Sequence, residues 1–252
     1  MSDEHRTSRQ DEWQTVRDTP PLVEDTVHVW LVRVPAIAGD APLSGEGGAA
    51  LQQPIAAGAS CLSRDEVERA RSLREPARSR FVVTRDALRS RLAAYLGCDP
   101  AHVGFDYGEM GKPHLRSGGA LHFSVAHSGD LALLAFARSA PVGIDLERLR
   151  RVPRRERVAR RVLARESADA LEAVPAAERD RAFIWAWTQR EAYVKAVGGG
   201  LYRSPDPLPF VWPPRPYESA GWHVTPLPGP VGYYACLVVH GTARSVRLLR
   251  MP

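Results

Sequence analysis

The sequence WTQREAYVK at residues 187–195, followed by the glycine run at 198–200, predicts a helix that ends in a glycine turn. Within it, Trp187, Glu191 and Lys195 are spaced four residues apart and share one helical face. The helix therefore presents an acid and a base side by side just before its end. We expect Trp187 to pack in the core and the two charged residues to face a functional site.

The sequence VGIDLE at residues 142–147 lies upstream and alternates apolar with acidic positions. Such a period of two predicts a strand that projects Asp145 and Glu147 to the same side. With Glu191 and Lys195, the chain then offers three carboxylates and a lysine. This set suits a divalent cation that holds a phosphorylated substrate, since magnesium takes a few carboxylate oxygens and leaves its other positions to phosphate and water.

These two blocks resemble the Gly-Ile-Asp-hydrophobic-Glu and Trp-Thr/Ser-x-Lys-Glu-Ala-x-x-Lys signatures of the 4′-phosphopantetheinyl transferases. Two further blocks agree in order and rough spacing, GKP at 111–113 and FSVAHSG at 123–129, and a basic helix around Arg80 precedes them. The resemblance spans residues 60–202. The length is typical of the large, surfactin-synthetase-activating type.

The resemblance implies an α+β fold of two similar halves, related by a pseudo-twofold axis, with the cofactor in the cleft between them. We expect halves at 1–140 and 141–252, with a polar, frayed tail over residues 1–25. A faint internal echo agrees, since RDAL at 85–88 is similar to REAY at 190–193. A monomer would suffice, because one chain supplies both sides of the cleft.

The resemblance also implies transfer of the 4′-phosphopantetheine arm of coenzyme A to a serine of an apo acyl or peptidyl carrier protein, releasing 3′,5′-adenosine bisphosphate. Asp145, Glu147 and Glu191 match the family's magnesium ligands, and Lys195 matches its phosphate-binding lysine. Glu191 is also the candidate base for the serine proton. The residues that match the family's cofactor-binding side chains are Arg80, Lys112, His127 and Lys195.

Three positions depart from the family pattern. Ala126 stands where a serine usually precedes the histidine, which removes one hydroxyl donor. Arg190 replaces a lysine, which keeps the charge and changes its geometry. Gly199 stands where many members carry a lysine. None of the three is a proposed metal ligand, so we expect an active enzyme.

Taken singly, these features have simpler interpretations: a solvated strand edge, an ordinary helix ion pair worth a few tenths of a kcal/mol, a surface histidine and a turn lysine. Their joint occurrence in the family's order favours a common site. A phosphohydrolase or other magnesium enzyme would share the acidic cluster but would leave Lys112 and His127 unexplained. A catalytically silent coenzyme A binder is a third alternative.

Composition and charge limit the remaining function classes. A chain of 252 residues with 44% hydrophobic content can bury a sizeable core. It has neither an apolar run long enough for a bilayer nor an apolar stretch near Met1 for a signal peptide, so we expect a cytoplasmic protein without a membrane partner. Its three cysteines are widely spaced, which predicts reduced, packed side chains.

The net charge of +5 is concentrated in the basic stretches 64–91 and 148–165, which would attract a polyanion. A nucleic-acid-binding module is therefore an alternative function. Few aromatic residues interleave with these arginines as base-stacking platforms would, so an anionic carrier protein or phosphorylated cofactor is the expected partner.

The periodicity predicts a mobile loop over 35–60, and a hairpin whose turn is 127–130. Helices are expected at 63–75, 78–96, 154–171 and 177–197, and strands at 26–34, 121–125, 131–137, 141–146, 222–225, 233–240 and 245–249.

Overall fold

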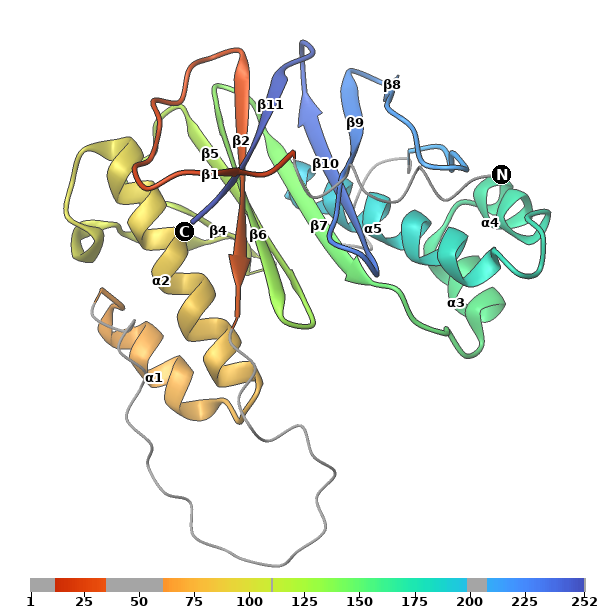
Figure 1. Ribbon diagram of the computed structural model, residues 1–252, viewed down its shortest axis with the longest axis horizontal. Coiled ribbons are helices and arrows are strands. Elements are labelled where there is room, and N and C mark those ends of the chain that lie inside the picture. The colour runs from red at the N-terminus through yellow and green to blue at the C-terminus, as the bar shows by residue number, and fades with distance from the viewer. Residues whose placement is uncertain (1–11, 35–60, 110, 199–207, 252) are drawn as a thin grey trace, which may run out of the picture. The chain divides into compact units, whose positions relative to one another are not determined.

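The computed structural model describes residues 12–34, 61–109, 111–198 and 208–251 (Figure 1). It is a mixed α+β structure with two compact units. The first comprises the described residues up to Leu31 and from Gly104 onward, and the second is Val32–Val103. The two similar halves expected at 1–140 and 141–252 stay a prediction.

The first unit contains two larger sheets and one small one (Figure 1). The five-stranded sheet has the order β1 (Gln14–Thr15), β11 (Ser245–Arg250), β2 (Thr26–Arg33), β6 (Leu131–Arg138) and β5 (Leu121–Ser128). The four-stranded sheet has the order β7 (Val142–Arg148), β10 (Tyr233–His240), β9 (Trp222–Leu227) and β8 (Tyr217–Ser219). The small sheet pairs β3 (Phe105–Tyr107) with β4 (Pro113–Leu115).

The order of strands does not follow the order of the chain. Strand β11 does not pair with β10, which precedes it in the sequence. It runs parallel to β2 instead, in the sheet that also contains β5 and β6. One hydrophobic cluster joins both larger sheets, with Val29 and Leu133 from one sheet and Ile144 and Leu237 from the other. Burying each such side chain is worth about 1.5–3 kcal/mol, so this shared core holds the two sheets together.

Helix α5 (Arg179–Val197) lies against β7 and β10 of the four-stranded sheet (Figure 1). The helix approaches so closely that a Cβ atom on Gly143 of β7 would lie 1.9 Å from the carbonyl oxygen of Ala192. Only glycine permits this contact. The helix ends at Gly198, whose φ of 80° is left-handed, as its sequence predicts. Trp187 is half-buried and stacks on Phe183, which confirms its core role.

The expected single helix over 154–171 is wrong. The structure has α3 (Arg155–Val162) and α4 (Arg165–Glu172), separated by extended backbone at Leu163 and Ala164. Neither proline nor glycine marks this break. Ala159 of α3 and Leu171 of α4 lie in one buried cluster with α5, so tertiary packing accounts for the change of direction.

The second unit contains α1 (Arg64–Ser72), α2 (Ala77–Leu96) and a 3-10 turn, η1 (Pro100–His102). Glu66 accepts a hydrogen bond from the Ser63 backbone amide at 2.9 Å, as the sequence pattern predicts. Glu66 also pairs with Arg89 at 2.7 Å, and both side chains are only 2% exposed. Arg89 donates further to the carbonyl oxygens of Pro100 and Val103, so this buried charge is fully engaged.

Other element predictions are confirmed with shifted ends. Strand β7 extends to Arg148, so Glu147 lies on it with Asp145, and α1 ends at Ser72, before the predicted 75. The hairpin turn is shorter than predicted: His127 and Ser128 belong to β5, and the turn is Gly129 and Asp130. Gly129 takes a φ of 60°, which a two-residue turn favours.

The predicted frayed tail over 1–25 is wrong for its described part. Trp13 is 5% exposed and donates from Nε1 to the carbonyl oxygen of Pro228 at 2.9 Å, which anchors the segment beside β1. The predicted loop over 35–60 lies outside the described residues. All three cysteines are free, but Cys98 is exposed rather than packed.

None of the helices that the structure describes combines the length and the apolar character that a membrane span requires.

Candidate functional site

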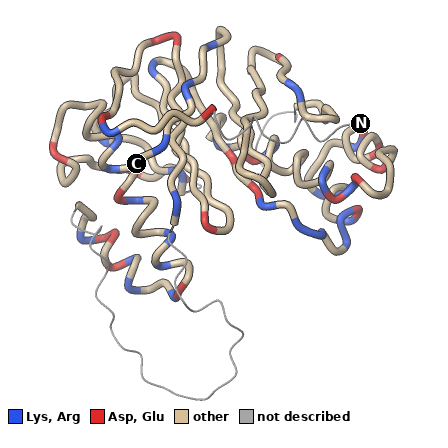
Figure 2. Tube along the Cα trace, in the orientation of Figure 1, with Lys and Arg blue, Asp and Glu red and all other residues tan. Residues whose placement is uncertain are grey.

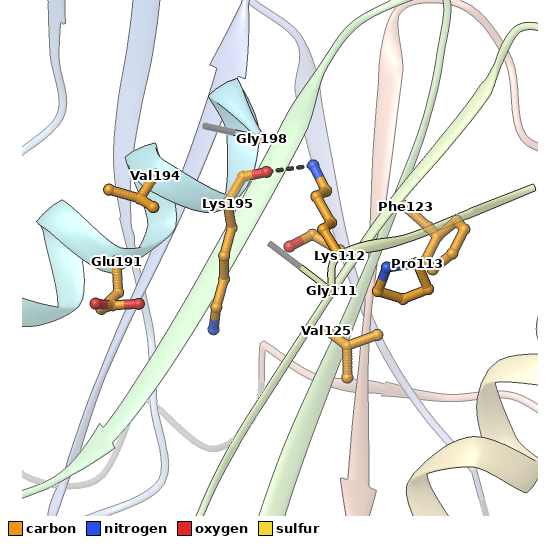
Figure 3. Close-up of a pocket in the computed structure, with 10 residues that line it drawn as sticks. Gly111, Lys112, Pro113, Phe123, Val125, Glu191, Val194, Lys195 and Gly198 are labelled. Carbon is orange, nitrogen blue, oxygen red and sulfur yellow. Dashed lines mark hydrogen bonds between the residues drawn. The ribbon is translucent and has the colours of Figure 1, made fainter. Parts of the chain in front are cut away.

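A pocket of about 340 Å³ lies in the first unit (Figure 3). Glu191, Val194 and Lys195 line it from the last turns of α5, and Phe123 and Val125 line it from β5. The other residues that line the pocket are Lys112 and Pro113 of the β4 region, together with Gly111, Ser124 and Gly198. The pocket therefore combines charged groups from α5 and the β4 region with an apolar wall.

A buried ion pair beside the pocket joins α5 to β7. Lys195 donates from Nζ to Oδ1 of Asp145 at 2.7 Å, and the Asp145 side chain is 8% exposed. Burial raises the pKa of Asp145 to about 7 against the opposing effect of Lys195, and Glu147 and Glu191 contribute to the rise. The three predicted metal ligands are thus close enough to influence one carboxyl group.

The second oxygen of Asp145, Oδ2, is buried and has no hydrogen-bond partner among the described residues. A buried acceptor left without a donor costs about 1–3 kcal/mol. Asp145 therefore fits an additional donor or cation at this oxygen.

Glu147 and Glu191 are both half-buried. Oε2 of Glu147 accepts from Oγ of Ser128 at 3.1 Å and from Nη1 of Arg150 at 3.4 Å. Burial raises the pKa of Glu191, Lys195 and Arg190 oppose the rise, and Glu147 adds to it. Even so, the described residues contain no group of three or more His, Cys, Asp or Glu side chains arranged to hold a metal ion.

Lys112 ties the β4 region to the end of α5. Its Nζ donates to the carbonyl oxygen of Lys195, one of the last carbonyls of the helix (Figure 3). Burial lowers the pKa of Lys112, and the neighbouring charge of Lys195 lowers it further. Both lysines bring positive charge to a half-buried pocket, which favours an anionic ligand.

The structure brings together five of the seven predicted site residues: Lys112, Asp145, Glu147, Glu191 and Lys195. His127 is an exposed residue of β5 that pairs with Ala132 and is not among the residues that line the pocket. Arg80 lies on α2, in the second unit. Contacts of His127 and Arg80 with the cofactor stay predictions.

Sequence reasoning missed two serines and one aromatic residue. Ser124 and Ser128 of β5 contact β7 through their hydroxyl groups, and Ser128 reaches Glu147. Phe123 lines the pocket and packs edge-on against Phe105 at a centroid distance of 5.7 Å. The alternation of FSVAHS carried a signal, because Ser124 and Ser128 fall on one face of a strand.

The chain is similar in sequence to known proteins. The family model described as the 4′-phosphopantetheinyl transferase superfamily matches residues 141–230, which contain the Lys195–Asp145 pair, Glu147 and Glu191.

Individual relatives agree. The 4′-phosphopantetheinyl transferase HetI of Nostoc sp. is 38% identical over 184 residues, covering 71% of this chain and 72% of the relative. The 4′-phosphopantetheinyl transferase Sfp of Bacillus subtilis is 29% identical over 153 residues, covering 56% and 67%. A further 4′-phosphopantetheinyl transferase of Bacillus subtilis is 31% identical over 114 residues, covering 45% and 50%. With its acidic strand and lysine-bearing helix meeting beside one pocket, the chain belongs to the 4′-phosphopantetheinyl transferase superfamily.

Proposed function

We propose that this protein transfers the 4′-phosphopantetheine group of coenzyme A to a serine hydroxyl of an apo acyl or peptidyl carrier protein, releasing 3′,5′-adenosine bisphosphate. The observation that carries the proposal is the Lys195–Asp145 pair beside Glu191, at a pocket that also holds Lys112. We propose further that the protein is of the large type, with two similar halves and the cofactor cleft between them.

In the proposed reaction, the serine oxygen forms a bond to the phosphorus next to the pantetheine arm. The bond from that phosphorus to the bridging oxygen of the pyrophosphate breaks, and negative charge collects on the departing adenosine bisphosphate. A fixed ammonium group near that charge stabilises the transition state more than the ground state. Lys195, held in place by Asp145, supplies this group, and Lys112 adds a second positive charge.

Glu191 is the proposed acceptor of the serine proton, directly or through a water molecule. Its half-buried position supports the role, because burial raises the pKa of this carboxyl and makes its carboxylate a better base near neutral pH. Lys195 on the same helical face opposes this rise in pKa and so favours the ionised form of Glu191.

Asp145, Glu147 and Glu191 are the proposed ligands of a magnesium ion. All three side chains offer carboxylate oxygens, which are the ligands that magnesium prefers. A cation could bind Oδ2 of Asp145, which is buried and has no hydrogen-bond partner among the described residues. When bound, magnesium would neutralise charge on the pyrophosphate oxygens. Arg80, Lys112, His127 and Lys195 are the proposed side chains for coenzyme A.

We propose a cytoplasmic protein that acts as a monomer on an acidic carrier, without nucleic acid or membrane as partner. The basic stretch 148–165 supports an anionic partner through charge complementarity.

The test is to incubate the protein with coenzyme A, magnesium and apo carrier proteins of the fatty-acid, polyketide and nonribosomal-peptide types, and to weigh each carrier. We expect one carrier to gain the mass of one phosphopantetheine group. A folded protein that binds coenzyme A and modifies none of the three would contradict the proposal and would support a silent coenzyme A binder instead.

A further inference from the structure

Strands β5 and β7 belong to different sheets, yet two hydroxyl groups connect them. Oγ of Ser124 accepts from the backbone amide of Ile144, and Oγ of Ser128 accepts from the backbone amide of Arg148, each at 3.1 Å. The two contacts repeat at the same register along both strands. They therefore form a seam in which serine side chains replace the backbone ladder between neighbouring strands.

The two serines differ in what else they contact. Oγ of Ser128 also lies 3.1 Å from Oε2 of Glu147 and donates to it. A hydroxyl group has one proton, and Ser128 already uses a lone pair to accept from Arg148, so its proton is directed at the carboxylate. Ser124 contacts no carboxylate in the part of the chain that the structure describes.

Ser128 is held firmly enough to orient a neighbour. It is the last residue of β5, and the turn that follows is bound to β10, because the hydroxyl of Tyr233 donates to Oδ1 of Asp130 at 2.8 Å. Gly129 leaves room for this contact, since a Cβ atom there would lie 2.3 Å from the Tyr233 oxygen. The Ser128 hydroxyl is thus fixed by its strand, its turn and the amide of Arg148.

The contact of Glu147 with Arg150 is weaker. Arg150 approaches Oε2 at 3.4 Å and its side chain is 60% exposed, so solvent screens the interaction. Both donors use Oε2, which leaves Oε1 of Glu147 without a donor among the described residues. The carboxylate is therefore held through one oxygen while the other stays available to a ligand.

We propose that Ser128 is a positioning residue that fixes the Glu147 carboxylate so that Oε1 can bind the divalent cation of the site. This inference rests on the proposed function, in which Glu147 is a metal ligand. Groups that hydrogen-bond to a metal ligand typically change metal affinity by 10–100-fold when removed. We expect the loss of one neutral hydroxyl to fall near the lower end of that range.

The experiment compares Ser128→Ala with Ser124→Ala, a matched control that removes the same kind of contact to β7 but none to a carboxylate. Mn²⁺ is titrated into each purified protein without coenzyme A, because Ser124 lines the pocket, and the free ion is followed by electron paramagnetic resonance. We expect Ser128→Ala to weaken Mn²⁺ binding about 10-fold, Ser124→Ala to leave it within twofold, roughly the scatter of such comparisons, and Ser128→Thr, which keeps the hydroxyl, to restore it.

Equal weakening in both alanine variants would assign the effect to the seam as a whole and overturn the proposal. Unchanged Mn²⁺ binding in Ser128→Ala, or a parent that binds no Mn²⁺, would overturn it too. If Ser128→Ala fails to fold, Ser128→Cys takes its place, since a thiol is a similar size but a weak donor. A parent that binds Mn²⁺ but transfers nothing to a carrier would overturn the proposed function alone, and the comparison of the serines would still decide the role of Ser128.

Discussion

Two charged regions of the first unit use similar side chains in different surroundings. Beside the pocket, Lys195 pairs with Asp145, whose side chain is 8% exposed. On α3 and α4, Arg160 pairs with Glu156 at 3.3 Å and with Asp169 at 3.4 Å, and all three side chains are more than half exposed. Exposed pairs contribute about 0–1 kcal/mol, whereas removing one partner of a buried pair leaves a charge in a medium that solvates it poorly.

The difference shows how burial separates a site from a surface. Beside the pocket, Asp145 and Lys112 each have a defined hydrogen-bond partner and an altered pKa. Figure 2 shows basic residues gathered along the segment from the end of β7 into α3, where they act through their summed field instead. Buried charged side chains therefore interact strongly with specific neighbours. Exposed ones act together, through a field that attracts an oppositely charged partner from a distance.

The largest effect is expected from neutralising the buried carboxylate. Asp145→Asn keeps the size of the side chain but removes its charge, so Lys195 loses its anchor and the proposed cation loses a ligand. We expect phosphopantetheine transfer to fall at least about 100-fold, as for other groups that stabilise transition-state charge. Asp169→Asn, which neutralises an exposed carboxylate on α4, is the control, and transfer to the carrier is measured by mass. Equal activity in Asp145→Asn and the parent would end the site assignment.

The next effect concerns pH. Burial raises the pKa of Asp145 from 3.8 to about 7, so the folded protein binds a proton there more tightly than the unfolded chain does. The contribution of Asp145 to stability is therefore full below pH 3.8 and is lost as the pH rises through about 7.

The measurement is urea unfolding of the metal-free protein across that range. We expect the free energy of unfolding of Asp145→Asn, relative to the parent, to rise with pH. A difference that stays constant with pH would show that the Asp145 carboxyl has an ordinary pKa.

The basic segment should affect partner binding more than chemistry. Arg155 donates to Asp180 at 2.9 Å, so its replacement would also disturb a contact within the fold. The exposed Arg151 and Arg157 are therefore better positions at which to test carrier binding. We expect Arg151→Glu with Arg157→Glu to raise the KM for an acidic carrier several-fold, with a smaller change in kcat, because the charges steer the encounter.

The control for that pair reverses two exposed charges elsewhere in the first unit, Arg17→Glu with Arg215→Glu. KM is measured at low ionic strength, where screening is least. The same KM shift in both double variants would indicate a general charge effect, and an unchanged KM would place carrier docking elsewhere.

The smallest effect is expected from the exposed pairs themselves. Arg160→Ala removes contacts to Glu156 and Asp169, both more than half exposed. We expect the free energy of unfolding to change by about 0.5 kcal/mol or less. Urea denaturation measures this change, and a loss of more than about 2 kcal/mol would mean that these pairs behave like buried ones.

Much of the site could be read from local pattern. The four-residue spacing of Glu191 and Lys195 predicted their helix, and the alternation around Asp145 and Glu147 predicted their strand. Gly97 and Gly198 marked the ends of α2 and α5, where both adopt left-handed backbone. These features depend on residues a few positions apart, so the sequence carries them directly.

Other features required the fold. Trp13 is buried and donates a hydrogen bond to the carbonyl oxygen of Pro228, which is 215 residues away in the sequence. Nothing in the polar N-terminal segment predicts that contact. The break between α3 and α4 follows from packing on α5 without a proline or glycine to mark it. Such contacts depend on which surfaces pack together in the fold. The residues of those surfaces can lie at any separation in the sequence, so no local pattern predicts them.

The sequence by itself determined that Asp145 and Glu147 lie on a strand and that Glu191 and Lys195 lie on a helix, because periodicity and glycine stops act over a few residues. Only the tertiary structure decided that Lys195 pairs with Asp145 and that Ser128 holds Glu147. The close approach of α5 to Gly143 and the seam between β5 and β7 create both contacts. Both contacts arise from the burial of apolar faces. Because this burial is non-directional, it can bring together polar groups that are far apart in the sequence.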